Sequence, residues 1–267
     1  MSPRFVAHRG GAALWPENSL LAFRSAIALG AGLLELDVHG TADGGVAVIH
    51  DPVLDRTTDA RGPVGARTLI ELRRTRLRGP DGRLTDEWVP AFDEVLALAA
   101  PAGVTLLIEI KTPGPAVAYE RGAAGFRAVP GPRYEGLERR VLEALTRAGM
   151  DGRAFVLAFS PAVIAEVREL APGQPTALLV DRDHVLASGA PPAAAVDWAC
   201  QARANFLGLH YTLCDGDVVG AARAAGLALG VFTVNDEVEM RRLAGLGVDV
   251  IISDRADLVQ RLSAEVA

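Results

Sequence analysis

Four charged side chains occupy alternate positions in two otherwise apolar stretches of the chain. Glu35 and Asp37 lie in the segment LLELDV, and Glu109 and Lys111 lie in LLIEIK. Side chains two residues apart in a strand point the same way, so each pair is expected to share one face. Burying unpaired carboxylates is costly, whereas a hard divalent cation with oxygen ligands would compensate them together. Glu35, Asp37 and Glu109 are therefore predicted to form a Mg²⁺ or Ca²⁺ site.

The same charges also have a purely structural interpretation. Lys111 and Arg9 carry the opposite charge and would neutralise the acids in a buried ion-pair network without any metal. Spacing alone leaves both interpretations open.

Two histidines are expected close to this acidic cluster. His8 closes the first expected strand and precedes Arg9, and His50 ends a hairpin-like segment and precedes Asp51. Phosphoryl chemistry needs a base for the attacking hydroxyl and an acid for the leaving oxygen, and imidazole titrates near neutrality. Two histidines beside acidic residues therefore favour an acid/base pair.

The other histidines have different expected positions. His39 follows Asp37 by two residues, so it is expected to support the same site from behind. His210 ends a later strand and is a candidate for the wall of the pocket. His184 is interpreted as an ordinary loop residue.

The predicted site requires elements that bring several strand ends together. Short apolar or β-branched runs bounded by Gly, Pro or Asp predict strands, and stretches with apolar residues at helical spacing follow them. The expected strands cover residues 4–8, 33–38, 104–110, 154–159, 176–180, 206–210, 228–234 and 248–253. The expected helices cover 17–29, 92–99, 137–148, 161–170, 217–225, 237–246 and 257–264, with a weakly marked element at 193–203.

This alternation predicts an α/β protein in which parallel strands close into a (β/α)8 TIM barrel. An open doubly wound sheet is the alternative. We expect one domain over residues 1–267, with a hairpin at 46–50 and an insertion at about 51–90 after the second strand. An extra rim loop at about 112–133 is expected to lie over the pocket. Barrels carry their chemistry at the C-terminal ends of the strands, which favours a functional role for the charged cluster.

Composition excludes several classes of protein. The 267 residues are 50% hydrophobic and 22% charged, in the range of a folded globular chain. A net charge of −6 without a basic face argues against nucleic acid as a partner. The longest uncharged run, 95–108, is too short for an integral membrane segment. The N-terminal residues lack the pattern of a signal peptide, so a cytoplasmic location is expected.

Several linked segments resemble the signature of the glycerophosphodiester phosphodiesterase family. They are AHRGGAALWPENSLLAF, LLELDVHGTADGGVAVIHD, LDRTT and LLIEIK, in the same order and spacing. Later segments, PAFDEVLAL, RYEGLERRV, GVFTVND and GVDVIISDRADL, are similar to the family's later landmarks, so the resemblance covers nearly the whole chain. It implies a TIM barrel with a small insertion after the second strand.

The resemblance also implies roles for individual residues. Glu35, Asp37 and Glu109 would bind one divalent metal ion, Mg²⁺ or Ca²⁺, and His8 and His50 would be the catalytic acid/base pair. Arg9 and Lys111 would hold the phosphate. The implied reaction is hydrolysis of a small-molecule glycerophosphodiester to an alcohol and sn-glycerol 3-phosphate. We favour His8 as the base and His50 as the acid, and attack by the glycerol hydroxyl or by water remains open.

One departure from the family pattern affects the pocket. Phe232 replaces the Trp that the family often carries in a VWTVN-like strand, so a ring is kept for packing against glycerol but the indole N–H is lost. Two alternatives to the implied reaction also remain. One is lysophospholipase D-like cleavage of phospholipids, and the other is a non-catalytic barrel that binds a phosphorylated ligand. The oligomeric state is left open.

Overall fold

The apolar residues of the strands separate into two layers in the computed structural model, which describes residues 2–122 and 125–266. Val6, Leu107 and Ile252 belong to a cluster drawn from strand residues and lie inside the ring of strands. Their neighbours along the chain, such as Leu106 and Ile108, belong to the main core together with helix residues. This division follows from the period of two along a strand, because each strand is covered on both faces.

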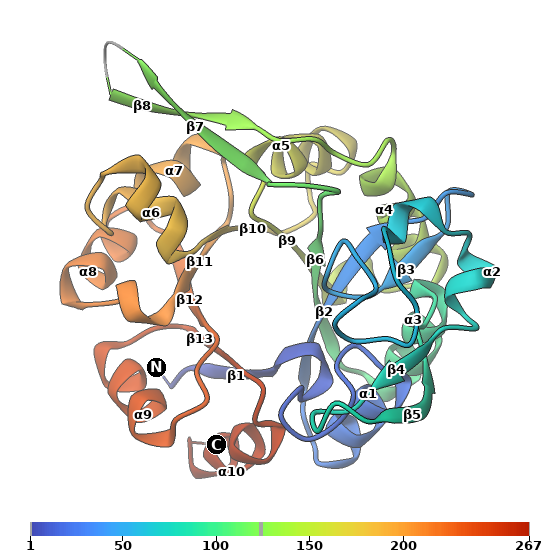
Figure 1. The fold of residues 1–267 in the computed structure, drawn as a ribbon. Coiled ribbons are helices and arrows are strands. Elements are labelled where there is room, and N and C mark those ends of the chain that lie inside the picture. The colour runs from blue at the N-terminus through green and yellow to red at the C-terminus, as the bar shows by residue number, and fades with distance from the viewer. Residues whose placement is uncertain (1, 123–124, 267) are drawn as a thin grey trace.

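Parallel strands form a closed ring at the centre of the molecule (Figure 1). β1 pairs with β2 and also with the last strand, β13, which leaves no free edge in the ring. The predicted TIM barrel is therefore confirmed, and the open doubly wound sheet is wrong. The ring consists of β1 (Arg4–Ala7), β2 (Leu33–Gly40), β6 (Thr105–Ile110), β9 (Ala154–Ala158), β10 (Thr176–Val180), β11 (Phe206–His210), β12 (Ala228–Phe232) and β13 (Val250–Ser253).

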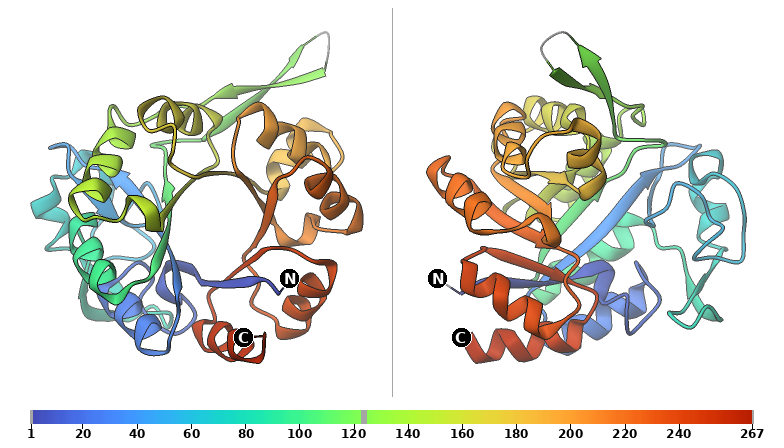
Figure 2. Two further views of the ribbon diagram at one scale, coloured as in Figure 1. Left: turned by 180° about the vertical axis from the view of Figure 1, so that it is seen from behind. Right: turned by 60° about the vertical axis from the view of Figure 1, so that its left-hand side comes forward.

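Helices surround this ring on the outside, as the left view of Figure 2 shows. The first helix begins at Leu20, three residues later than expected, because the Ser19 hydroxyl accepts a hydrogen bond from the Ala22 N–H as its N-cap. The surrounding helices are α1 (Leu20–Ala28), α3 (Phe92–Ala102), α4 (Leu137–Arg147), α5 (Pro161–Leu170), α6 (Arg182–Ser188), α7 (Ala194–Gln201), α8 (Gly216–Ala224), α9 (Glu237–Leu246) and α10 (Ala256–Val266). Short 3-10 turns are η1 (His8–Gly10), η2 (Val64–Ala66), η3 (Asp151–Arg153) and η4 (Tyr211–Leu213).

The insertion after β2 has its own small core. The predicted hairpin is present as β3 (Val46–Val48), which pairs antiparallel with β2. The following segment contains α2 (Leu69–Leu72) and the antiparallel strands β4 (Arg76–Arg78) and β5 (Leu84–Trp88). Its buried residues form a separate cluster, which consists of Ala47, Ile49, Leu54, Val64, Leu72, Leu77 and Val89.

The expected rim loop at 112–133 is a second antiparallel hairpin. Its strands are β7 (Val117–Gly122) and β8 (Gly125–Pro130), and residues 123–124 lie outside the described part. Figure 1 shows the hairpin extending outward from the ring. Gly114 and Ala116 at the base of this segment line the pocket, and the hairpin itself leads away from the ring.

Across the described residues, the helices are too short or too polar to cross a bilayer.

Candidate active site

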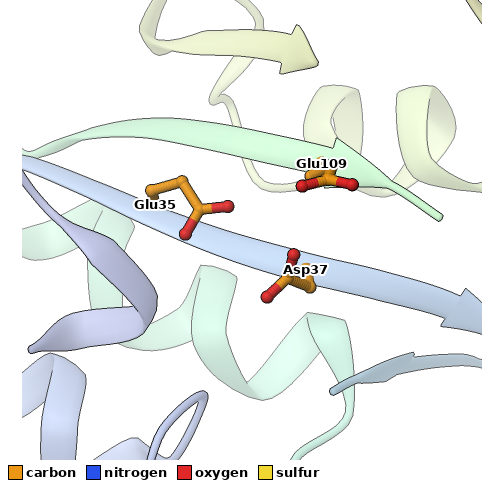
Figure 3. A group of neighbouring side chains, drawn as sticks. All are labelled: Glu35, Asp37 and Glu109. Atoms are coloured by element: carbon orange, nitrogen blue, oxygen red, sulfur yellow. The ribbon is translucent and has the colours of Figure 1, made fainter. Parts of the chain in front are cut away.

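Three buried carboxylates meet near the C-terminal ends of β2 and β6 (Figure 3). In the register of these parallel strands Asp37 lies beside Glu109, and Glu35 lies beside Leu107, one step deeper in the barrel. One ligand oxygen from each of Glu35, Asp37 and Glu109 lies within 4.8 Å of the others. Because side chains alternate between the two faces of a strand, these three acids all point into the barrel. Its inner face is therefore acidic toward the C-terminal ends of the strands.

Two cations lie against this acidic group. Lys111 Nζ is 2.9 Å from Asp37 Oδ1 and 2.6 Å from Glu109 Oε1, and Arg9 Nε is 3.2 Å from Asp37 Oδ2. Asn18 completes the surroundings of Asp37, since its Nδ2 donates to Asp37 Oδ2 at 2.8 Å. Burial acts against the charge on Lys111, but Asp37 and Glu109 prevail and raise its pKa. The ion pairs of the structural interpretation are therefore present.

Glu35 is the acid that these cations leave uncompensated. Its Oε2 accepts a hydrogen bond from the Arg9 backbone N–H at 3.1 Å and lies 3.7 Å from His8 Nε2. Within the described residues no Lys or Arg side chain forms an ion pair with Glu35. Burial and the negative charge of Asp37 raise the pKa of Glu35 well above its usual range. A divalent cation would supply the missing charge, so the all-oxygen set fits a hard metal ion.

His8 is oriented by an aspartate from the other end of the chain. His8 Nδ1 lies 2.6 Å from Asp254 Oδ1, and Asn235 Nδ2 donates to Asp254 Oδ2 at 2.7 Å. This arrangement uses Nδ1 and leaves Nε2 directed to the acidic group, 3.7 Å from Glu35. Burial and the nearby charge of Arg9 lower the pKa of His8, while the hydrogen bond to Asp254 acts to raise it.

His50 has a corresponding aspartate partner next to it in the sequence. His50 Nδ1 lies 2.6 Å from Asp51 Oδ1. Arg56 in turn donates to Asp51 and, with two more hydrogen bonds of 2.8 Å, to Glu17. Burial acts to raise the pKa of Asp51, but the hydrogen bonds from His50 and Arg56 hold it well below the usual range. Arg56, which lies in the insertion, thus holds Asp51 in place, and Asp51 in turn orients the ring of His50.

His39 supports the backbone of His50. Its Nε2 donates to the His50 carbonyl at 2.9 Å, so its Nδ1 accepts a hydrogen bond from the Tyr134 hydroxyl, also at 2.9 Å. Burial lowers the pKa of His39 to about 4, which keeps the ring neutral. His39 therefore supports the backbone of His50, and it also lines the pocket rather than lying wholly behind it.

These groups face one pocket of about 530 Å³. Its opposite wall is aromatic, because the Phe232 ring packs edge-to-face against Phe159 at 5.9 Å and His210 at 6.1 Å between centroids. The candidates that line the pocket are His8, Arg9, Glu35, His39, His50, Glu109, Lys111, His210 and Phe232. Asp37, the remaining candidate, is fully buried behind them. A pocket with cations, acids and paired histidines at one side and rings at the other suits a phosphate ester with a short carbon chain.

Sequence reasoning missed several of these residues. Asp254 directly follows the predicted strand 248–253, so the rule that polar residues gather after barrel strands was a signal for it. Arg56 lies in the LDRTT segment, which carried the resemblance but no assigned role. The interpretation of His184 as a loop residue is wrong, because it lies in α6 and lines the pocket.

Comparison with known proteins adds an independent finding. Residues 8–258 match the model of the glycerophosphoryl diester phosphodiesterase family. The chain is 29% identical over 257 residues to a glycerophosphodiester phosphodiesterase of Caldanaerobacter subterraneus, covering 95% of both. It is 30% identical over 276 residues to one of Bacillus altitudinis, covering 98% of both.

Solved structures share the fold. The crystal structure of a glycerophosphodiester phosphodiesterase from Agrobacterium tumefaciens is 27% identical, with a TM-score of 0.73 over 97% of this chain and 99% of that one. A phosphodiesterase from Oleispira antarctica, solved in complex with its product sn-glycerol-3-phosphate, is 24% identical, with a TM-score of 0.77 over 99% of this chain and 97% of that one.

Proposed function

The chain belongs to the glycerophosphoryl diester phosphodiesterase family, and on this premise we propose that it hydrolyses glycerophosphodiesters to an alcohol and sn-glycerol 3-phosphate. One observation carries the proposal beyond family membership. His8 and His50 line the same pocket as Glu35 and Glu109, and each histidine has its Nδ1 held by an aspartate. That arrangement leaves both Nε2 atoms for proton transfer.

Each charged group has a proposed part in the reaction. Glu35, Asp37 and Glu109 would hold one Mg²⁺ or Ca²⁺ ion, which when bound neutralises charge on the phosphate oxygens. Arg9 and Lys111 would bind the phosphate monoanion and stabilise the charge that grows on its equatorial oxygens. The attacking hydroxyl gives its proton to one histidine, and the other histidine gives a proton to the departing alcohol. Whether that hydroxyl comes from glycerol or from water is a separate question.

The alternative, lysophospholipase D-like cleavage, needs an apolar trough for an acyl chain beside the site. A second pocket of about 890 Å³ shares Phe159, Leu179 and His184 with the catalytic pocket. It continues past Leu178 and Trp198 between the helices. Its lining also includes Arg168, Glu169, Gln201 and Arg203, so it does not favour an acyl chain, and the assay below distinguishes the two reactions.

A coupled assay for glycerol 3-phosphate release tests the proposal. Glycerophosphocholine is supplied first with EDTA and then with excess Mg²⁺ or Ca²⁺, and lysophosphatidylcholine is assayed in parallel for choline release. Turnover of the first substrate that is lost with EDTA and restored by a metal supports the proposed reaction and identifies the ion. Choline release from the lysolipid alone supports the alternative. If the folded protein turns over neither substrate, the result supports the other alternative, a non-catalytic barrel that binds a phosphorylated ligand.

Location is part of the same proposal. The substrate is a water-soluble small molecule, and the cytoplasm remains the compartment proposed from the sequence. Fractionation of the source cells with this enzyme activity as the marker tests it.

A further inference from the structure

A third pocket adjoins the catalytic pocket at His8, Arg9 and Thr233, which line both. It has a volume of about 560 Å³ and is called the side pocket below. Its other walls come from the segment after β1 and from the insertion after β2. They include Trp15, Glu17, Arg56, Arg78, Gly79 and Gly82.

The shared wall lies where the reacting phosphorus must be. The phosphate of a diester has to reach His8 and the guanidinium of Arg9, and a phosphodiester carries two ester arms on that one phosphorus atom. The ring surfaces of Phe159 and Phe232 suit the carbon chain of glycerol in the catalytic pocket. The other arm then extends past His8 into the side pocket. The second pocket is a poorer outlet, because its lining includes neither His8 nor His50.

The side pocket contains one cation whose charge is not neutralised. Its carboxylates are already engaged, since Glu17 pairs with Arg9 and Arg56, and Asp254 pairs with His8. Arg78 donates from Nε to the Thr58 carbonyl and from Nη1 to the Gly82 carbonyl, both at 3.0 Å. Over residues 2–122 and 125–266, no carboxylate forms an ion pair with Arg78.

We propose that the side pocket binds the alcohol group of the diester and that Arg78 selects alcohols bearing an anionic group, such as the carboxylate of serine. A half-buried guanidinium fixed by two backbone carbonyls is well placed for such a group, because little side-chain freedom is lost on binding. The inference rests on the proposed function and names its head-group class.

The same placement assigns the proton transfers. An alcohol in the side pocket leaves on the His8 side of the phosphate, so the P–O bond to the alcohol breaks as His8 Nε2 protonates the alcohol oxygen. The attacking hydroxyl forms the new P–O bond and gives its proton to His50. This is the reverse of the assignment favoured from the sequence.

Glycerophosphoserine and glycerophosphoethanolamine differ by one carboxylate and therefore form a matched pair of substrates. We expect the metal-supplemented enzyme to have a kcat/KM for the serine ester at least about fivefold above that for the ethanolamine ester. Arg78→Ala should abolish this ratio by lowering turnover of the serine ester alone, and Arg78→Lys should keep part of it. Arg83→Ala is the control, because Arg83 lies on the same hairpin with its side chain 88% exposed.

A measurement without variants covers the case in which Arg78→Ala does not fold. The serine-to-ethanolamine ratio of the unaltered enzyme should decrease as salt screens the guanidinium. Equal kcat/KM values for the two esters, or a ratio that persists in Arg78→Ala, would overturn the inference and leave the proposed function standing. Failure to hydrolyse either ester with any metal would instead refute the proposed function, and the inference with it.

Discussion

His8 Nδ1 lies 2.6 Å from Asp254 Oδ1, although 246 residues separate the two along the chain. The contact results from closure of the barrel, because Ala7 of β1 pairs with Ser253 of β13 and the next residue of each strand reaches the same rim. The ends of the first and last strands therefore build one histidine–aspartate unit together.

Removing the carboxylate from this unit should reduce catalysis more than binding. In Asp254→Asn the amide does not stabilise the protonated His8 ring that donates from Nε2, so we expect kcat to fall by about 10²- to 10⁴-fold with little change in KM. Steady-state kinetics measures this, and Asp257→Asn at an exposed ion pair nearby is the control. A raised KM with unchanged kcat would assign Asp254 to ground-state binding instead.

The proton donor for the departing alcohol can be identified with an activated substrate. The glycerophosphodiester of p-nitrophenol has a leaving group that departs without protonation. His8→Ala should therefore lose activity toward glycerophosphoserine while retaining most of it toward the nitrophenyl ester, whereas His50→Ala should lose both. Release of nitrophenolate, followed by absorbance, measures the difference. Rescue of His50→Ala instead would restore the assignment of His8 as the base.

Metal binding should stabilise the fold through the carboxylates on β2 and β6. A cation that binds the native state raises the melting temperature in proportion to the logarithm of its concentration above Kd. We expect this rise with Mg²⁺ or Ca²⁺ in the unaltered protein and its loss in Glu109→Gln, whereas Glu143→Gln, on the exposed side of α4, should behave normally. Differential scanning calorimetry provides the readout. An equal rise in Glu109→Gln would contradict the predicted ligand set.

Asp181 is the N-cap residue of α6, and the stabilisation that it provides should be lost in acid. The hydrogen bond from His184 lowers the pKa of Asp181 to about 2, below the value of about 3.9 in an unfolded chain. The folded state thus favours the ionised form, so its stabilisation is complete above about pH 4 and is lost as the pH falls toward 2. Because Asp181 is partly exposed, we expect a loss of about 1 kcal/mol. Urea unfolding of the protein and Asp181→Asn from pH 6 downward should show their free energies converging.

The sequence by itself determined the barrel and the acidic group at its rim. A strand places every second residue on one face, so LLELDV and LLIEIK already specify that Glu35 and Asp37, and Glu109 and Lys111, share a face. Runs of apolar residues long enough for buried strands, with helical stretches between them, specify the alternation that closes into a ring. These are local regularities, and they need no knowledge of distant contacts.

Only the tertiary structure decided which groups orient the histidines and which further pocket adjoins them. Asp254 reaches His8 because the ring closes between β1 and β13, and Arg56 reaches Glu17 because the insertion folds back over the first loop. The side pocket joins residues of that loop to Arg78 on the insertion hairpin in the same way. Such contacts depend on the closure and register of the whole barrel, and no periodicity within a single segment carries that information.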